Sequence, residues 1–179
     1  CLLLTLYIQD EWQYDKQHKE LQNLYRIVTH YNREGEFSTS GTTSPPVAQT
    51  MRNEIPEIEV AARVFNPPGV DLNLIKYQDK IFYEKNGLIA DSSIFDIFTY
   101  SFLEGVASKA LNRPNTIVIS DQLAEKLFSN ESALGKVIAV SQGQGFVDYQ
   151  ITGVFEEQKQ SHLQANFFTS MLSDGWGTF

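Results

Sequence analysis

The chain has 179 residues, of which 42% are hydrophobic and 12% aromatic, so it can form a hydrophobic core and is not expected to be disordered. Its formal net charge of -8 at pH 7 disfavours bulk electrostatic attraction to nucleic acid or to an anionic membrane surface. The single cysteine, Cys1, allows no disulfide within the chain and says nothing about the compartment.

The chain starts with an apolar run, Leu2–Ile8. The run is too short to span a bilayer, which needs about 20 residues, but it fits the last turns of a spanning helix that begins earlier. A soluble amphipathic helix is the alternative. Tyr7, Trp12 and Tyr14 beside the run are typical of a membrane interface, although packing under the domain would also explain them. We expect residues 1–23 to be the end of a transmembrane helix and a stalk.

Residues 24–66 have the pattern of a small α+β layer, strand-helix-strand. Leu24–Thr29 is rich in β-forming residues, whereas the Gly, Ser and Thr residues of Arg33–Ser44 indicate a mobile polar loop. Ser44 and Pro45 favour a helix start, and Pro56 ends that helix. Ile58–Val64 then alternates between apolar and other residues, as a half-buried strand does. The apolar face of the helix comprises Val47, Ala48, Met51 and Ile55.

Asn66–Gly69, with the sequence NPPG, breaks this pattern and indicates a subdomain boundary. The chain then changes to short strands separated by turns. The expected strands are Val70–Tyr77, Ile81–Glu84, Leu88–Ala90, Val137–Val140 and Tyr149–Phe155. We therefore expect a mostly β inserted subdomain at 67–158 and a return to the first layer at 159–179.

Two short helices are expected inside this insert. Ser93 is placed to cap the first of them, and Ser120 follows a buried β-branched strand, Thr116–Ile119, and is placed to cap the second. Gly135 is expected to end the second helix. That helix is amphipathic, with Leu123, Ala124, Leu127 and Phe128 on one face. The predicted fold class is therefore α+β.

The histidines and serines show no catalytic or metal-binding pattern. His18, His30 and His162 are not at metal-ligand spacing with another ligand residue, and polar surface or capping explains them. Ser161 lies beside His162, but nucleophile and base meet through folding rather than adjacency, and there is no GxSxG motif.

Acidic pairs and a glycine-containing loop are equally weak signals. The pairs Asp10 with Glu11 and Glu156 with Glu157 are typical of solvated surfaces. The SGTTSPP segment precedes a helix but lacks the GK[ST] ending of a P-loop. We therefore assign no catalytic, cofactor-binding or metal-binding residue, and we expect no enzyme activity.

Several blocks, in order, resemble one family. The chain contains ADSSIFDIFTYSFLEGVASKAL followed by NTIVISDQLAEKLFSNESALGK, preceded by EWQYDKQHKELQNLYRIV and followed by YQITGVFEEQ and SHLQANFFTSM. These blocks resemble the MacB-like periplasmic core domain, found in permease subunits of FtsX-like ABC transporters. The resemblance covers nearly the whole chain. It implies a compact membrane-proximal subdomain interrupted by a mostly β insert, and a permease that continues past Phe179 into a second transmembrane helix.

The resemblance also implies a function. It implies an inner-membrane permease whose periplasmic domain is non-enzymatic and couples ATP-driven motion across the membrane to export or release of a substrate. The implied partners are a separate cytoplasmic ATPase subunit, a second permease copy, a periplasmic adaptor or outer-membrane channel, and the membrane through the N-terminal helix. An extracytoplasmic sensor or ligand-binding module that regulates a partner without transport is the alternative. Nothing in the residues selects a substrate.

Overall fold

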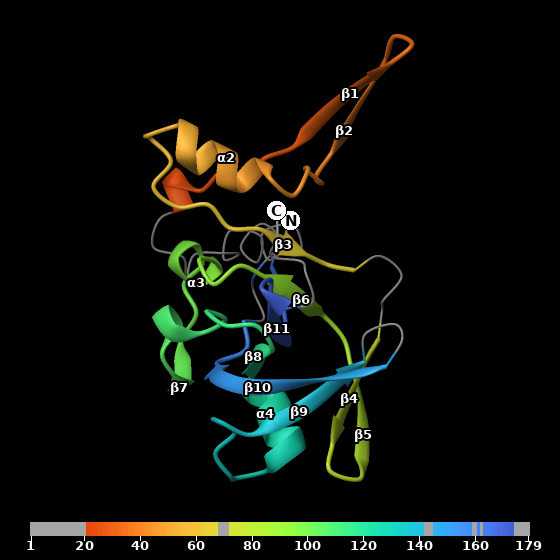
Figure 1. Cartoon of the computed structure of the whole chain (residues 1–179), viewed down its shortest axis with the longest axis vertical. Coiled ribbons are helices and arrows are strands. Elements are labelled where there is room, and N and C mark those ends of the chain that lie inside the picture. Colours follow the sequence, from red (N-terminus) through yellow and green to blue (C-terminus); the bar gives the residue numbers. More distant parts are fainter. Residues whose placement is uncertain (1–20, 68–71, 142–144, 159–160, 162, 174–179) are drawn as a thin grey trace, which may run out of the picture.

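A computed structural model describes residues 21–67, 72–141, 145–158, 161 and 163–173 (Figure 1). These residues have an α+β fold that consists of a nine-stranded mixed sheet and a separate two-stranded hairpin. The hairpin and the helix α2 (Val47–Glu54) lie at one end of the molecule, above the sheet in Figure 1. Within the described residues, no helix has the length and apolar character needed to cross a membrane.

The central strands of the sheet are covered on both faces. The remaining elements are η1 (Leu21–Asn23), β1 (Thr29–Arg33), β2 (Glu36–Ser40), β3 (Val64–Phe65), β4 (Asn73–Tyr77), β5 (Lys80–Glu84), β6 (Gly87–Ala90), α3 (Ile94–Ile97), β7 (Phe102–Gly105), η2 (Ala107–Lys109), β8 (Thr116–Ser120), α4 (Asp121–Phe128), β9 (Val137–Ser141), β10 (Phe146–Phe155) and β11 (Phe167–Ser170). The strand order is β3-β6-β11-β8-β10-β9-β4-β5, and β7 pairs with β10. The pairs β8–β10 and β6–β11 are parallel. Every residue of β8 is buried, as expected for a strand covered on both faces.

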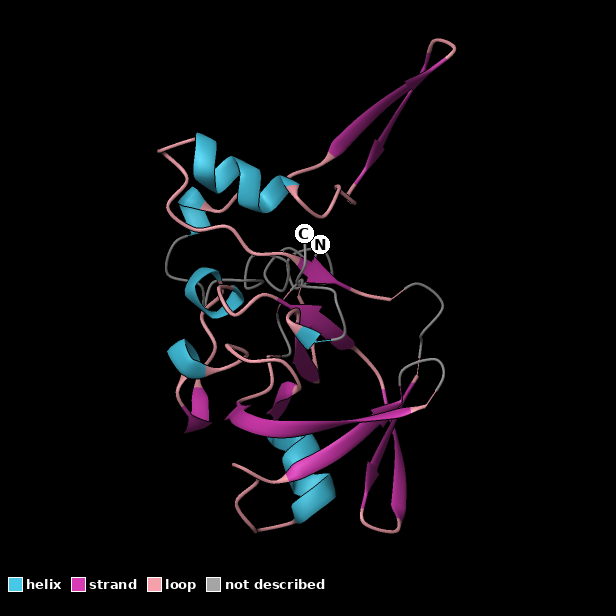
Figure 2. Cartoon of the chain, viewed as in Figure 1, coloured by secondary structure: helices cyan, strands magenta, loops and turns pink. Residues whose placement is uncertain are grey.

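Two apolar clusters lie on opposite faces of the sheet. Figure 2 shows the helix α4 below the long strand β10 and the short helix α3 above it. On one face, α4 buries Leu123, Leu127 and Phe128 against β8, β9 and β10. On the other face the α3 region contributes an aromatic cluster, in which ring pairs lie 5.1 to 5.8 Å apart between centroids. The cluster includes Phe95, Tyr100, Phe155 and Phe168. Each large apolar side chain that is fully buried stabilises the fold by about 1.5 to 3 kcal/mol.

The predictions for the second half of the sheet are mostly confirmed. The strand at Thr116 is β8, and the hydroxyl of Ser120 accepts a hydrogen bond from Leu123 N at 3.2 Å, which caps α4. The expected helix end at Gly135 is wrong, because α4 ends at Phe128. Ser129 follows with a φ of 56° and a ψ of -122°, far from helical values, so the helix does not continue through it.

The predictions for the first layer need correction. Residues 24–28 form no strand, and β1 starts only at Thr29. The expected loop Arg33–Ser44 contains β2, which pairs with β1 through a turn at Glu34 and Gly35. Both turn residues have positive φ, as a two-residue hairpin turn requires. The helix is present but starts at Val47. The strand expected over Ile58–Val64 is reduced to β3, whose two residues pair with β6.

Segments from either side of the expected insert meet in the large sheet. Strand β3 comes from the segment before residue 67 and β11 from the segment after 158, and both pair with β6. The division of the chain at residues 66 and 158 stays a prediction. The predicted stalk lies outside the described residues except for Leu21–Asn23, which form the short helix η1.

Candidate functional site

The described histidine, serine and glutamate residues that the sequence analysis weighed as catalytic do not come together in a catalytic site. His30 lies on the exposed hairpin, where its Nδ1 is 2.9 Å from the hydroxyl of Thr39. Ser161 is buried, and its hydroxyl accepts a hydrogen bond from Leu163 N at 3.2 Å. Glu157 accepts a hydrogen bond from the amide of Gln122. Tyr7, Asp10, Glu11, Trp12, Tyr14, His18 and His162 lie outside the described residues.

Neither the surface hollows nor the potential metal ligands among the described residues indicate a binding site. Over this part of the chain, no three His, Cys, Asp or Glu side chains gather as metal ligands. An open hollow of about 390 Å³ is lined by amide side chains near the start of α4. Asn166 in its wall donates to the carboxylate of Glu84 at 2.6 Å, and Gln158 donates to Thr99 O at 2.6 Å, so these amides are used within the protein.

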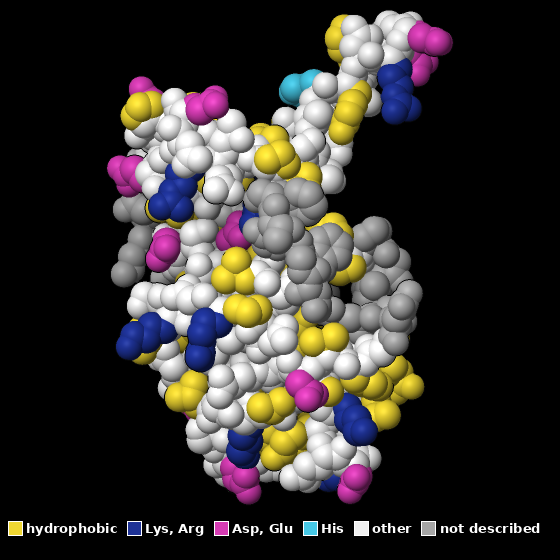
Figure 3. All heavy atoms as spheres, in the orientation of Figure 1, with side chains coloured by type: hydrophobic (Ala, Val, Ile, Leu, Met, Phe, Trp, Pro, Cys, Tyr) yellow, Lys and Arg dark blue, Asp and Glu magenta, His cyan; other side chains and the backbone are white. Residues whose placement is uncertain are grey.

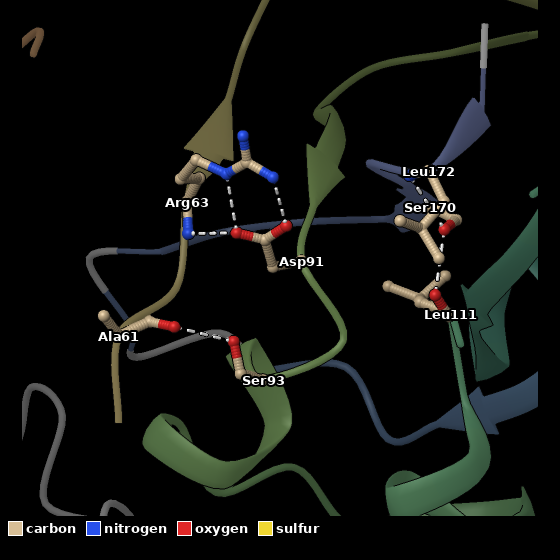
Figure 4. Close-up of polar contacts among 7 residues, drawn as sticks. All are labelled: Ala61, Arg63, Asp91, Ser93, Leu111, Ser170 and Leu172. Atoms are coloured by element: carbon tan, nitrogen blue, oxygen red, sulfur yellow. Dashed lines mark hydrogen bonds and ion pairs between the residues drawn. The ribbon is translucent and has the colours of Figure 1, made fainter. Parts of the chain in front are cut away.

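The most elaborate polar contact joins Arg63, just before β3, to Asp91, just after β6 (Figure 4). Arg63 Nη2 donates to Asp91 Oδ1 at 2.8 Å, and Nε donates to Oδ2 at 2.9 Å. The backbone N–H of Arg63 donates to the same Oδ2 at 2.9 Å, and Asp91 N donates to Arg63 O at 3.1 Å. A bidentate guanidinium–carboxylate pair fixes both distance and orientation. We call this contact the clasp.

A second contact supports the clasp. The hydroxyl of Ser93 donates to Ala61 O at 2.8 Å (Figure 4). Ser93 does precede α3, but its side chain makes no hydrogen bond to the helix start, so the predicted cap is wrong. Its backbone φ of -64° and ψ of -7° are helical, which differs from the usual extended geometry of a capping residue. The hydroxyl instead fastens residues 61–63 to the α3 region.

The end of β11 is fastened to the same sheet by similar means. The hydroxyl of Ser170 donates to Leu111 O at 2.8 Å and accepts from Leu172 N at 3.2 Å (Figure 4). Met171 N donates to Ala90 O at 2.8 Å, one residue before Asp91. Because Ala90 is the last residue of β6 and precedes Asp91, this bond places the end of β11 next to the clasp.

The clasp is partly shielded from water. The side chains of Arg63 and Asp91 are 19% and 23% exposed. The side-chain hydrogen bond from Arg63 to Asp91 raises the pKa of Arg63, so the guanidinium stays charged. A partly buried, doubly hydrogen-bonded pair is held more firmly than an exposed one. The clasp therefore fastens the chain segment that precedes β3 to the large sheet.

Sequence reasoning did not identify the clasp. Asp91 stands in the ADSS block that carries the family resemblance, but a single acidic residue there gives no indication of its partner. Arg63 lies in the segment Ile58–Val64, for which the sequence pattern predicts a half-buried strand and indicates no partner. The contact depends on the β3–β6 register, in which Val64 pairs with Ala90, and the two residues are 28 apart in sequence.

The described residues define an α+β domain in which a clasp ties one chain segment to a mixed sheet. The sequence matches the family model of the MacB-like periplasmic core domain over residues 1–176. The chain therefore belongs to this family, the periplasmic domains of MacB-like and FtsX-like ABC transporter permeases.

Solved structures of similar domains were also found. A permease domain from Porphyromonas gingivalis has 27% sequence identity and a TM-score of 0.63, with 74% of this chain and 59% of that chain covered. The periplasmic region of MacB from Actinobacillus actinomycetemcomitans has 14% identity and a TM-score of 0.49, with 70% and 53% covered. The extracellular domain of the transporter YknZ from Gram-positive bacteria has 19% identity and a TM-score of 0.42, with 61% and 51% covered. The chain thus spans less than two thirds of each of these structures. No curated protein matches the sequence.

Proposed function

We propose that this chain is the non-enzymatic periplasmic part of an inner-membrane ABC transporter permease, and that it couples ATP-driven motion across the membrane to export or release of a substrate. In this proposal a separate cytoplasmic ATPase subunit, acting with a second permease copy, drives the motion. The motion enters through residues 1–23. Family membership supports the class of protein, and the clasp between Arg63 and Asp91 supports the coupling.

In this proposal, motion from residues 1–23 reaches the sheet through the chain segment that ends at the clasp. The hairpin and α2 precede β3 in the chain, and the sheet follows it. Residues 55–63 between α2 and β3 form no helix or strand, so the position of this segment depends on its contacts with the rest of the domain. Four hydrogen bonds between Arg63 and Asp91 fix the end of this segment to β6.

The experiment weakens the clasp in the full permease reconstituted with its ATPase. Arg63→Met and Asp91→Asn each remove the ion pair, and Glu131→Gln is the matched control because it breaks the pair of Glu131 with Lys136, 2.6 Å long, away from the clasp. Dyes on cysteines at Thr50 in α2 and Asp79 in the β4–β5 turn, in a Cys1→Ser background, report whether the two parts move as one body during ATP turnover.

We expect the parent and Glu131→Gln to keep a narrow dye separation through the ATP cycle. Both clasp variants should broaden it and lower transport per ATP hydrolysed, while assembly and nucleotide binding persist. Equal dye separations and equal transport per ATP in the clasp variants would show that the clasp does not transmit the motion.

A further inference from the structure

At one end of the sheet, β5, β4, β9 and the first half of β10 are covered on one face only, whereas the second half of β10 reaches the aromatic cluster on the other face through Phe155. In β5, β4, β9 and β10 the side chains of one face join the cluster under α4, for example Ile75, Ile138 and Tyr149. The alternate residues lie on the other face, where the described chain places no helix. We call this the open face. Strands β4, β9 and β10 contribute Leu74, Lys76, Val137, Ala139, Phe146 and Asp148, and β5 adds Ile81 and Tyr83, which pair with Lys76 and Leu74. Figure 3 shows hydrophobic side chains and charged ones of both signs close together in the region of β4, β5 and β9.

The strand register arranges the open face in rows. Lys76 pairs with Ala139, and Ala139 pairs with Asp148, so these three residues form one row across β4, β9 and β10. Two residues further along, Leu74 and Phe146 flank Ser141, which pairs with Phe146. Two residues from Ala139 in the opposite direction along β9, Val137 is the β9 residue of a third row and pairs with Gln150 of β10. Thus β9 supplies the middle of each row, and β4 and β10 supply the two sides.

The side chains of this face are available for contact. Val137 is 50% exposed and Phe146 is 44% exposed, which is high for large apolar residues. Lys76 and Asp148 are exposed as well, and neither forms an ion pair with any described residue. The row therefore presents one cation and one anion, each available for pairing, on either side of the small side chain of Ala139.

This arrangement of charged and apolar side chains is self-complementary. We propose that the open face binds the open face of a second copy of this chain, with a twofold axis parallel to β9 above Ala139. Such an axis leaves each row opposite itself and exchanges the β4 and β10 sides. Lys76 then lies opposite Asp148 of the second copy, and Leu74 lies opposite its Phe146. Ala139 and Val137 lie opposite their own copies.

Charge decides both the occupant and the orientation. A twofold axis across the strands would place Lys76 opposite Lys76 and Asp148 opposite Asp148, which repel. The axis parallel to β9 instead places each Lys76 opposite an Asp148, which attract. The defined face carries one positive and one negative charge, so it offers no excess charge to a strongly basic or acidic partner. Packed sheets lie about 10 Å apart, and a small residue at the axis permits that approach. This inference does not depend on the coupling function.

The test uses charge reversal in the purified chain. Lys76→Glu and Asp148→Lys each create two repulsive contacts in the proposed dimer, whereas the double variant restores two attractive ones with the signs exchanged. Glu125→Lys, on the exposed side of α4, is the matched control. Sedimentation velocity gives the dimer dissociation constant, and far-UV circular dichroism checks that each variant is folded.

We expect each single variant to weaken the dimer at least about tenfold, the double variant to return within about threefold of the parent, and Glu125→Lys to leave it unchanged. A short bis-maleimide should also crosslink Ala139→Cys in a Cys1→Ser background into a covalent dimer. A parent chain that stays monomeric would refute the proposal. So would single variants that dimerise like the parent, or a double variant that is not restored.

Discussion

Gly87 at the start of β6 is a position where no side chain fits. A Cβ there would lie 2.1 Å from Phe167 Cζ, and Phe167 is a buried core residue in the parallel partner strand. Gly87→Ala should therefore lower the free energy of unfolding by about 1 to 3 kcal/mol, because the ring has to move within a packed core. Urea denaturation measures this value. Gly145→Ala is the control, since a Cβ at Gly145 has no neighbour within 4 Å, and an equal loss in both variants would contradict the steric account.

The ionisation of Glu104 makes the stability of the fold depend on pH. Its carboxylate accepts hydrogen bonds from the Ser132 hydroxyl at 2.6 Å and from Leu134 N at 3.0 Å. The Ser132 hydrogen bond is the main cause that lowers the pKa of Glu104. A carboxyl whose folded pKa lies below its unfolded pKa stabilises the fold above the unfolded value, about 4.3, and this stabilisation is lost as the pH falls through the folded pKa.

We therefore expect Glu104→Gln to be less stable than the parent at pH 7, with a difference that shrinks below about pH 4. The effect should be small because the carboxylate is mostly solvated. Urea titrations of both proteins between about pH 3 and pH 7 measure it across the range in which the carboxyl titrates. Glu125→Gln is the comparison. A stability difference between the parent and the Glu104→Gln variant that does not vary with pH would contradict the role of the ionised carboxylate.

At the scale of elements, α4 shows how far sequence could predict the structure. Its cap, its apolar face and the strand before it all follow from local patterns, and Ser120, Leu123 and Leu127 lie as expected. Burial produces those patterns, since core positions must be apolar at the period of the element. The packing is specific as well, because Phe128 lies edge-on to Tyr77 with ring centroids 4.7 Å apart.

Phe128→Ala should lower the free energy of unfolding by about 3 to 5 kcal/mol, since the side chain is only 5% exposed and its removal leaves a cavity under the sheet. Phe37→Ala on the hairpin is the matched control: Phe37 is 81% exposed, and its loss should change stability by less than about 0.5 kcal/mol. Chemical denaturation of both variants decides the point. Similar losses would mean that α4 does not carry the core of this face.

Elements without a buried face were not predictable in this way. The residues of β1 and β2 are almost all exposed, so no alternation of apolar and polar residues indicates the hairpin. Strand β3 has only two residues, too few for a period. The clasp was beyond local reasoning for the same reason. Arg63 and Asp91 meet only because β3 and β6 pair, and that pairing is a property of the whole sheet.

At the scale of the whole molecule, the structure divides into a well-buried sheet and a projecting hairpin (Figure 1). Strand β8 lies between β11 and β10, and all of its residues are buried. The hairpin β1–β2 pairs with no other described strand, and an isolated two-stranded hairpin is at best marginally stable in water. Local stability should therefore differ greatly between the two parts.

Native-state hydrogen exchange tests this division. Amides of Ile117, Val118 and Ile119 should exchange only through global unfolding, whereas those of Tyr31 and Ser38, which pair across the hairpin, should exchange at least about a hundredfold faster. Gly87→Ala provides the control, because a lower global stability should speed exchange in β8 and leave the hairpin rate unchanged. If instead the hairpin amides are as protected as those of β8 and respond equally to Gly87→Ala, the hairpin unfolds together with the sheet. The clasp would then join parts of one cooperative unit, and the motion proposed for the permease would have to be transmitted by the whole domain.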